Sequence, residues 1–136
     1  MAITPDQLKQ VPLFSELGNR ELQSIADSMR ERTFDAGSTI TEEGKSGIGF
    51  FVIEDGTATV TIGGSEVRKL GAGDYFGEIA LMAKGPRSAT IVADTDMHCQ
   101  GLAVWDFRAL VEANESMSWK LLETLAERLS ASQPAD

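Results

Sequence analysis

The chain is 136 residues long, with 42% hydrophobic and 24% charged residues, and its formal net charge is -9. This length suits a single domain, and the composition is that of an ordinary soluble globular protein. The acidic balance argues against direct binding of nucleic-acid phosphates, and no apolar run is long enough to cross a membrane.

Residues 1–31 show a helical pattern. A short helix is predicted at residues 6–11, and a second one is expected near Asn19, whose side chain can cap it. The apolar side chains that follow recur at helical spacing on one face, and they are Leu22, Ile25, Ala26 and Met29. We therefore predict N-terminal helices, the second of which packs on a sheet.

Between residues 32 and 104 the pattern changes to short strands separated by glycine-containing turns. Ala58, Val60 and Ile62 alternate with threonines, as in a strand with one buried face. The pairs Asp55-Gly56 and Gly63-Gly64 are both typical of hairpin turns, and two more strands are predicted at residues 89–93 and 97–104. Many short antiparallel strands at regular spacing indicate a sandwich, a barrel or a jelly roll.

Residues 105–131 return to a helical pattern, broken near Asn114. The last helix carries an apolar stripe, formed by Met117, Leu121, Leu122, Leu125 and Leu129. Trp105 and Trp119 are expected to pack against helices or in the core. With no repeat and no linker, the chain is expected to be one domain, with helices at 1–31, a β core at 32–104 and helices at 105–131.

His98 and Cys99 lie in one predicted strand. One histidine and one cysteine cannot build a zinc site of the usual composition, and no Ser-His-acid set is evident, so we expect no metal site and no catalytic site. A single cysteine forms no internal disulfide, and the N-terminus lacks a signal-peptide pattern. These features favour a reducing, cytoplasmic setting.

Residues 74–90 combine three features that suit a phosphate and a neighbouring hydroxyl. Gly77 permits unusual backbone angles or a close ligand approach, and the apolar run after it can form a short helix whose first N–H groups favour an anion. Glu78 can accept a hydrogen bond from a hydroxyl. Arg87, which follows a tight turn, offers a planar fork that makes paired bonds to phosphate.

This stretch resembles the phosphate-binding cassette of cyclic nucleotide-binding domains, as found in regulatory subunits of protein kinase A and in the catabolite activator protein. The matching residues are Phe76-Gly77-Glu78-Ile79-Ala80-Leu81 and Pro86-Arg87-Ser88-Ala89-Thr90. Residues 43–56 and 70–74 resemble segments that precede the cassette in domains of the same family. The resemblance implies a mainly β fold, an eight-stranded jelly-roll-like sandwich or barrel with helices at both ends.

The resemblance also implies the site. Its ligand-binding residues would be Phe76, Gly77, Glu78, Ile79, Ala80, Arg87, Ser88 and Ala89. Glu78 would contact the ribose 2′-hydroxyl and Arg87 the phosphate, while Ile79 and Ala80 would act through backbone N–H groups with their side chains in the core. Ser88 leaves the base open, with cyclic AMP ahead of cyclic GMP. Ser132 and Gln133 fall loosely where relatives contact the base, as a lid.

The expected function is that of a sensor that binds a cyclic nucleotide reversibly and repositions its terminal helices, without enzyme activity and without a cofactor other than the ligand. Its partners would be the nucleotide and a protein effector or a second copy bound through the terminal helices. Two alternatives stay open. One is an interaction module that has kept the fold but lost nucleotide binding, and the other is a binder that prefers cyclic GMP. The sequence does not separate a stand-alone protein from an excised regulatory domain.

Overall fold

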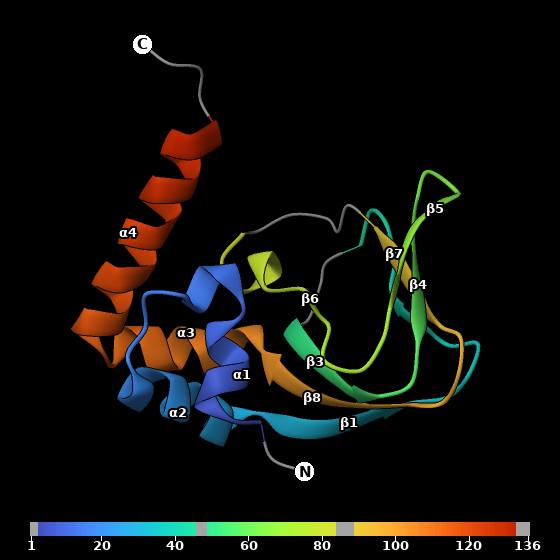
Figure 1. The fold of residues 1–136 in the computed structure, drawn as a ribbon, viewed down its shortest axis with the longest axis horizontal. Coiled ribbons are helices and arrows are strands. Elements are labelled where there is room, and N and C mark those ends of the chain that lie inside the picture. The colour runs from blue at the N-terminus through green and yellow to red at the C-terminus, as the bar shows by residue number, and fades with distance from the viewer. Residues whose placement is uncertain (1–2, 46–48, 84–88, 133–136) are drawn as a thin grey trace. The chain divides into compact units, whose positions relative to one another are not determined.

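The structure is a computed structural model that describes residues 3–45, 49–83 and 89–132. The chain divides into two compact units, which are described separately. The β unit spans Met29–Val104, and the helical unit combines Ala2–Ser28 with Trp105–Asp136. Figure 1 shows the helices and strands of both. Among the described residues, no helix has the length and apolar character needed to cross a bilayer.

The helices of the helical unit come from both ends of the chain. They are α1 Pro5–Lys9, the 3₁₀ turn η1 Pro12–Phe14, α2 Asn19–Ser28, α3 Val104–Glu112 and α4 Glu115–Ser132. Thr4 caps α1 in a reciprocal capping box with Gln7. Asn19 is the first residue of α2 rather than its cap, and the Gly18 carbonyl accepts the first bond of that helix. The helical segment ends at Ser28, before the predicted residue 31.

The core of the helical unit is apolar. Its fully buried side chains include Leu8, Leu13, Phe14, Leu22, Ile25, Met117 and Leu121. The rings of Phe14 in η1 and Phe107 in α3 lie 6.1 Å apart, and η1 also contacts α1 and α4. Segments about ninety residues apart in sequence therefore share one core, so the two ends of the chain depend on each other for burial.

The described residues of the β unit form eight strands in two antiparallel four-stranded sheets, which confirms the predicted mainly β, jelly-roll-like fold. The strands are β1 Arg30–Phe34, β2 Thr39–Thr41, β3 Gly49–Asp55, β4 Ala58–Ile62, β5 Ser65–Leu70, β6 Tyr75–Phe76, β7 Thr90–Ala93 and β8 Met97–Ala103. One sheet has the order β1-β8-β3-β6 and the other β2-β7-β4-β5. β1 thus begins two residues before the predicted β core.

Side chains from both sheets form one hydrophobic core in the β unit. Its buried members are Phe51, Ile53, Ala58, Val60, Leu70, Phe76, Ile91, Ala93, Met97 and Cys99. Alternation in β4 places Ala58 and Val60 inward, as the sequence pattern predicts. The prediction is wrong for Ile62, which is exposed after a register shift between Val60 and Thr61. The first five residues of β3 are all buried, and the ring centroids of Phe50 in β3 and Tyr75 in β6 lie 6.2 Å apart.

The two predicted glycine hairpins have different outcomes. Gly63 and Gly64 connect the paired strands β4 and β5, and both have positive φ angles, of 60° and 81°, as this hairpin class requires. The hairpin predicted at Asp55-Gly56 is wrong, because β3 and β4 belong to different sheets. Gly56, with φ 101°, instead carries the chain between the sheets.

The helical unit also corrects expectations about large apolar side chains. Trp105 and Trp119 are exposed, at 66% and 65% of their surface, so neither packs in a core. In the predicted stripe of α4, Met117 and Leu121 are buried, whereas Leu122 and Leu129 are exposed. Only the first half of the stripe therefore finds a packing surface within the described residues.

Candidate functional site

β6 fixes the start of the candidate cassette. It pairs with β3 in the register Phe51↔Phe76 and Val52↔Tyr75. The Phe76 ring is buried and stacks on the Phe51 ring with centroids 5.2 Å apart. Phe76, predicted as a ligand-binding residue, therefore has its side chain in the core, where it anchors the cassette to the sheet.

The loop before β6 is held by Asp74. Its carboxylate accepts a hydrogen bond from the Gly71 N–H at 2.8 Å. Its carbonyl accepts from the Ile53 N–H at 2.8 Å, and the Gly73 N–H donates to the Ile53 carbonyl at 2.8 Å. The approach to the cassette is thus tied to β3 on both sides of its turn.

Gly77 and Glu78 form the turn that leaves β6. Gly77 has a φ of 87°, in the left-handed region that favours glycine. Glu78 has helical backbone angles and precedes the 3₁₀ turn η2 Ile79–Leu81, without capping it through its side chain. Glu78 is half-buried, and its carboxylate makes no capping hydrogen bond to the turn that follows. This suits an acceptor for a ligand hydroxyl.

η2 is a single turn rather than a longer helix. The Ala80 and Leu81 N–H groups donate to the Gly77 and Glu78 carbonyls at 3.1 and 3.2 Å. The Leu81 side chain is buried, and η2 contacts β3. The expectation that Ile79 lies in the core is wrong, because 45% of its surface is exposed. Ala80 is half-buried.

The second half of the predicted site lies largely outside the described residues. This holds for Arg87 and Ser88, and for the turn 84–86 before them. Ala89 is described: it packs against the core of the β unit, and its carbonyl accepts a hydrogen bond from the Thr41 hydroxyl at 3.3 Å. The strand that follows the predicted arginine is therefore fixed to β2.

The predicted lid residues lie at the end of the helical unit. Ser132 is the last residue of α4, is exposed, and donates its hydroxyl hydrogen to the Leu129 carbonyl at 2.9 Å. Gln133 lies outside the described residues. A lid role for either residue stays a prediction.

His98 and Cys99 alternate in β8 between solvent and core. Cys99 is buried, and burial, with a smaller contribution from the Glu54 charge, raises the pKa of its thiol to about 11. His98 is exposed, with its Nδ1 atom 3.4 Å from the Glu31 carboxylate. Among residues 3–45, 49–83 and 89–132, no group of three or more His, Cys, Asp or Glu side chains could hold a metal ion.

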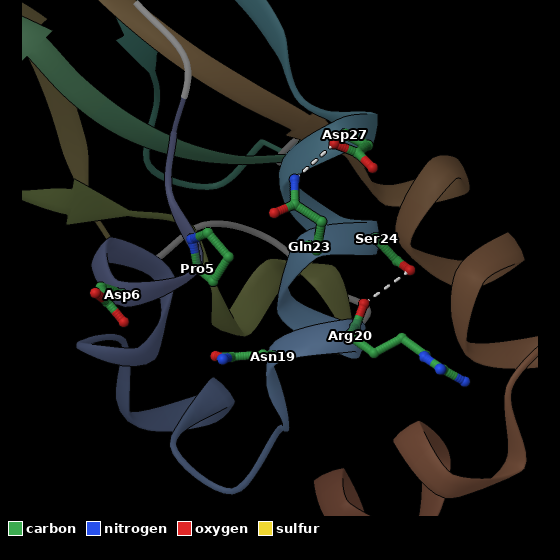
Figure 2. Close-up of a pocket in the computed structure, with 7 residues that line it drawn as sticks. All are labelled: Pro5, Asp6, Asn19, Arg20, Gln23, Ser24 and Asp27. Atoms are coloured by element: carbon green, nitrogen blue, oxygen red, sulfur yellow. Dashed lines mark hydrogen bonds between the residues drawn. The ribbon is translucent and has the colours of Figure 1, made fainter.

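An open pocket of about 630 Å³ lies in the helical unit, and none of the described predicted site residues lines it. Its lining comes from α1 and α2, and comprises Pro5, Asp6, Asn19, Arg20, Gln23, Ser24 and Asp27. Figure 2 shows that some of these groups already bind each other: the Gln23 amide donates to Asp27 at 2.8 Å, and the Ser24 hydroxyl donates to the Arg20 carbonyl at 3.1 Å. The lining therefore mixes charged, polar and apolar groups.

Comparison with known proteins finds relatives that match most of the chain. A cAMP-dependent protein kinase regulatory subunit of Yarrowia lipolytica is 38% identical over 106 residues, which cover 76% of this chain and 28% of the relative. A cyclic nucleotide-gated potassium channel of Rhizobium etli is 37% identical over 118 residues, which cover 87% of this chain and 33% of the relative. The chain thus spans a third or less of the length of these relatives.

The fold agrees with these matches. The crystal structure of the N-terminal domain of a transcriptional regulator from Streptomyces coelicolor superimposes with a TM-score of 0.84 at 26% identity, covering 96% of this chain and 99% of the other. Residues 31–114 match the family described as the cyclic nucleotide-binding domain. Because this match includes more than half of the chain, the protein belongs to the cyclic nucleotide-binding domain family.

Proposed function

We propose that this chain binds a 3′,5′-cyclic nucleotide reversibly, and that cyclic AMP is its preferred ligand. The observation that carries the proposal is the cassette itself: Gly77 in a left-handed conformation, then Glu78, whose carboxylate does not cap the tight turn that follows it. Similarity to protein kinase regulatory subunits named for cAMP supports the choice of ligand. The proposed activity is binding and not catalysis.

In the proposed complex the cassette divides the ligand among its residues. Glu78 accepts a hydrogen bond from the ribose 2′-hydroxyl, because an ionised carboxylate is only an acceptor. Arg87 pairs with the cyclic phosphate through charge-assisted bonds, and Ser88 adds a hydroxyl donor. The acidic chain needs this local positive charge, since a net charge of -9 repels an anion at long range.

Cyclic AMP should raise the melting temperature of the purified protein. With free ligand near 100 times its dissociation constant, linkage adds about 2.7 kcal/mol to the free energy of unfolding. For a chain of this size the shift is on the order of 10 °C. Scanning calorimetry with cyclic AMP, cyclic GMP and 5′-AMP measures it, and 5′-AMP is the control because it lacks the cyclic phosphate.

The same measurement separates the alternatives. A larger shift with cyclic GMP than with cyclic AMP would identify a cyclic GMP-preferring binder. Equal melting temperatures with and without either cyclic nucleotide at millimolar concentration would overturn the proposal and favour an interaction module that has kept only the fold.

We also propose that ligand binding repositions the terminal helices. The support is the division of the chain into two compact units, with unit boundaries at residues 28–29 and 104–105. A ligand biases such an arrangement only if it binds one position of the helices better than another.

A second candidate role is self-association through α4. Trp119, Leu122, Ala126 and Leu129 recur at the spacing of a coiled-coil seam on this helix, and all four are exposed. A seam of this kind is self-complementary, so we propose a second copy of the chain as its occupant. Because α4 has only 18 residues, the pairing should be weak and concentration-dependent.

Sedimentation velocity should therefore show a monomer–dimer equilibrium that Leu122→Glu abolishes, since the new charge would be desolvated in the seam. Val67→Glu is the matched control, because Val67 is similarly exposed but lies in β5. A wild-type chain that stays monomeric at high concentration would leave the α4 face to a different protein and refute self-association.

A further inference from the structure

Glu21 is a charged side chain buried in the helical unit, with 4% of its surface exposed. Its Oε1 atom accepts hydrogen bonds from the Gly18 backbone N–H at 2.8 Å and from the Lys120 ammonium at 2.7 Å. Its Oε2 atom accepts a bond from the Ser116 hydroxyl at 2.7 Å. One carboxylate in α2 therefore binds the start of its own helix and two residues of α4, nearly a hundred positions away.

The bonded residues lie in the first two turns of α4, which are fixed in other ways as well. The Asn114 side chain accepts a hydrogen bond from the Met117 N–H at 3.1 Å and so caps the helix. Met117 and Leu121 are fully buried. Further along α4, Thr124 is buried, whereas Leu122 and Leu129 are exposed. The bonds from Glu21 thus reach a part of α4 that packs in the core of the helical unit.

The environment keeps the Glu21 carboxyl ionised at neutral pH. Burial raises its pKa, but the hydrogen bonds from Lys120, Ser116 and Gly18 and the Lys120 charge lower it by more, so the pKa lies below its usual value. Only the Glu21 end of the pair is buried, since 38% of the Lys120 side chain is exposed. Losing the bonds to a buried carboxylate still costs more free energy than losing an ion pair that is exposed at both ends. Arg108–Glu112 on α3 is the exposed counterpart in the same unit, with N–O distance 2.7 Å.

We propose that the Glu21 carboxylate is a joint that makes α2 and the first two turns of α4 move as one rigid body. Repositioning of the terminal helices then displaces these elements together, and α4 does not slide along α2. This inference rests on the ligand-driven repositioning proposed above, but the joint itself exists with or without ligand. Glu21 is a positioning residue, which acts on the proposed response only through α4.

Hydrogen exchange of the ligand-free protein tests the joint directly. Glu21→Gln removes the charge, and Ser116→Ala removes one bond from an exposed position while leaving Glu21 paired with Lys120. Because hydrogen bonds to a charged group are strong, we expect amide exchange in residues 115–121 to accelerate on the order of tenfold or more in Glu21→Gln, and less in Ser116→Ala. Arg108→Ala should leave that segment unchanged. If residues 115–121 exchange at the wild-type rate in both Ser116→Ala and folded Glu21→Gln, the proposed joint is wrong.

Adding cyclic AMP tests the rigid body. In the wild-type protein, the ligand should change the exchange rates of residues 19–28 and 115–121 in the same direction, or change neither. In Glu21→Gln, the two segments should respond to the ligand independently. A response in 115–121 alone in the wild-type protein would show that α4 slides, against the inference. If no cyclic nucleotide binds, the proposed function fails, while the ligand-free comparison still decides whether Glu21 joins the helices.

Discussion

Replacing Arg87 with alanine is expected to lower the affinity for cyclic AMP by roughly tenfold to 150-fold. The physical reason is the loss of a hydrogen bond between two charged groups, which contributes about 1.5–3 kcal/mol. The protein should stay folded, since the role proposed for Arg87 is to bind the ligand phosphate and not to pack in a core. Isothermal titration calorimetry gives the affinity, and circular dichroism checks the fold.

Glu78→Gln supplies the matched comparison. It should also weaken cyclic AMP binding, because a carboxylate is a stronger acceptor for the ribose hydroxyl than an amide. With 2′-deoxy cyclic AMP, which lacks that hydroxyl, the Glu78→Gln penalty should shrink, whereas the Arg87→Ala penalty should persist. An unchanged affinity of the folded Arg87→Ala protein would place the phosphate elsewhere. If the losses of affinity caused by Glu78→Gln and by the missing 2′-hydroxyl simply add, Glu78 does not contact the ribose.

Gly56→Ala is expected to be strongly destabilising, by about 2–5 kcal/mol. A Cβ atom at this position would lie 2.5 Å from the Asp96 carbonyl oxygen and 2.9 Å from the Met97 Cα atom. Both contacts are with backbone, so relieving them requires the turn between β7 and β8 to move, at the cost typical of overpacking. The φ of 101° adds strain for any residue with a side chain.

Gly63→Ala is the control for the strain alone. Gly63 also has a positive φ, of 60°, but a Cβ atom there would meet nothing within 4 Å. Gly63→Ala should therefore lower the free energy of unfolding by about 1–2 kcal/mol. Thermal unfolding should therefore show a drop on the order of 10 °C for Gly56→Ala and a clearly smaller one for Gly63→Ala. Equal drops would mean that the contacts with Asp96 and Met97 relax without cost.

The two glycine pairs show how far local sequence reaches. Gly63-Gly64 was predicted as a hairpin and forms one, because a two-residue turn with positive φ angles is decided by the residues that make it. Asp55-Gly56 has the same local pattern and joins two sheets instead. β3 pairs with β6 and β8, whereas β4 pairs with β5 and β7, and no local pattern contains these pairings.

The sequence likewise predicted the motif of the cassette but not which of its side chains are buried. The order of Gly77, Glu78 and Arg87 is a local motif, and it indicated both the family and the chemistry of the ligand. That the Phe76 side chain belongs to the core while Ile79 is exposed depends on where β6 pairs with β3. Sequence spacing does not contain that pairing, since the partner strand lies about 25 residues earlier.

The sequence by itself therefore determined the mainly β fold, the two sets of helices and the family, because periodicity, turn residues and a dense motif are all local. Only the tertiary structure decided which apolar and charged side chains are buried. Glu21 reads as an ordinary acid in the first turn of a helix, yet it is buried because Ser116 and Lys120 reach it from the other end of the chain. Trp119 reads as a core residue, yet it is exposed because Met117 and Leu121 face the core of the helical unit instead. Burial depends on contacts between distant segments, and these exist only in the folded chain.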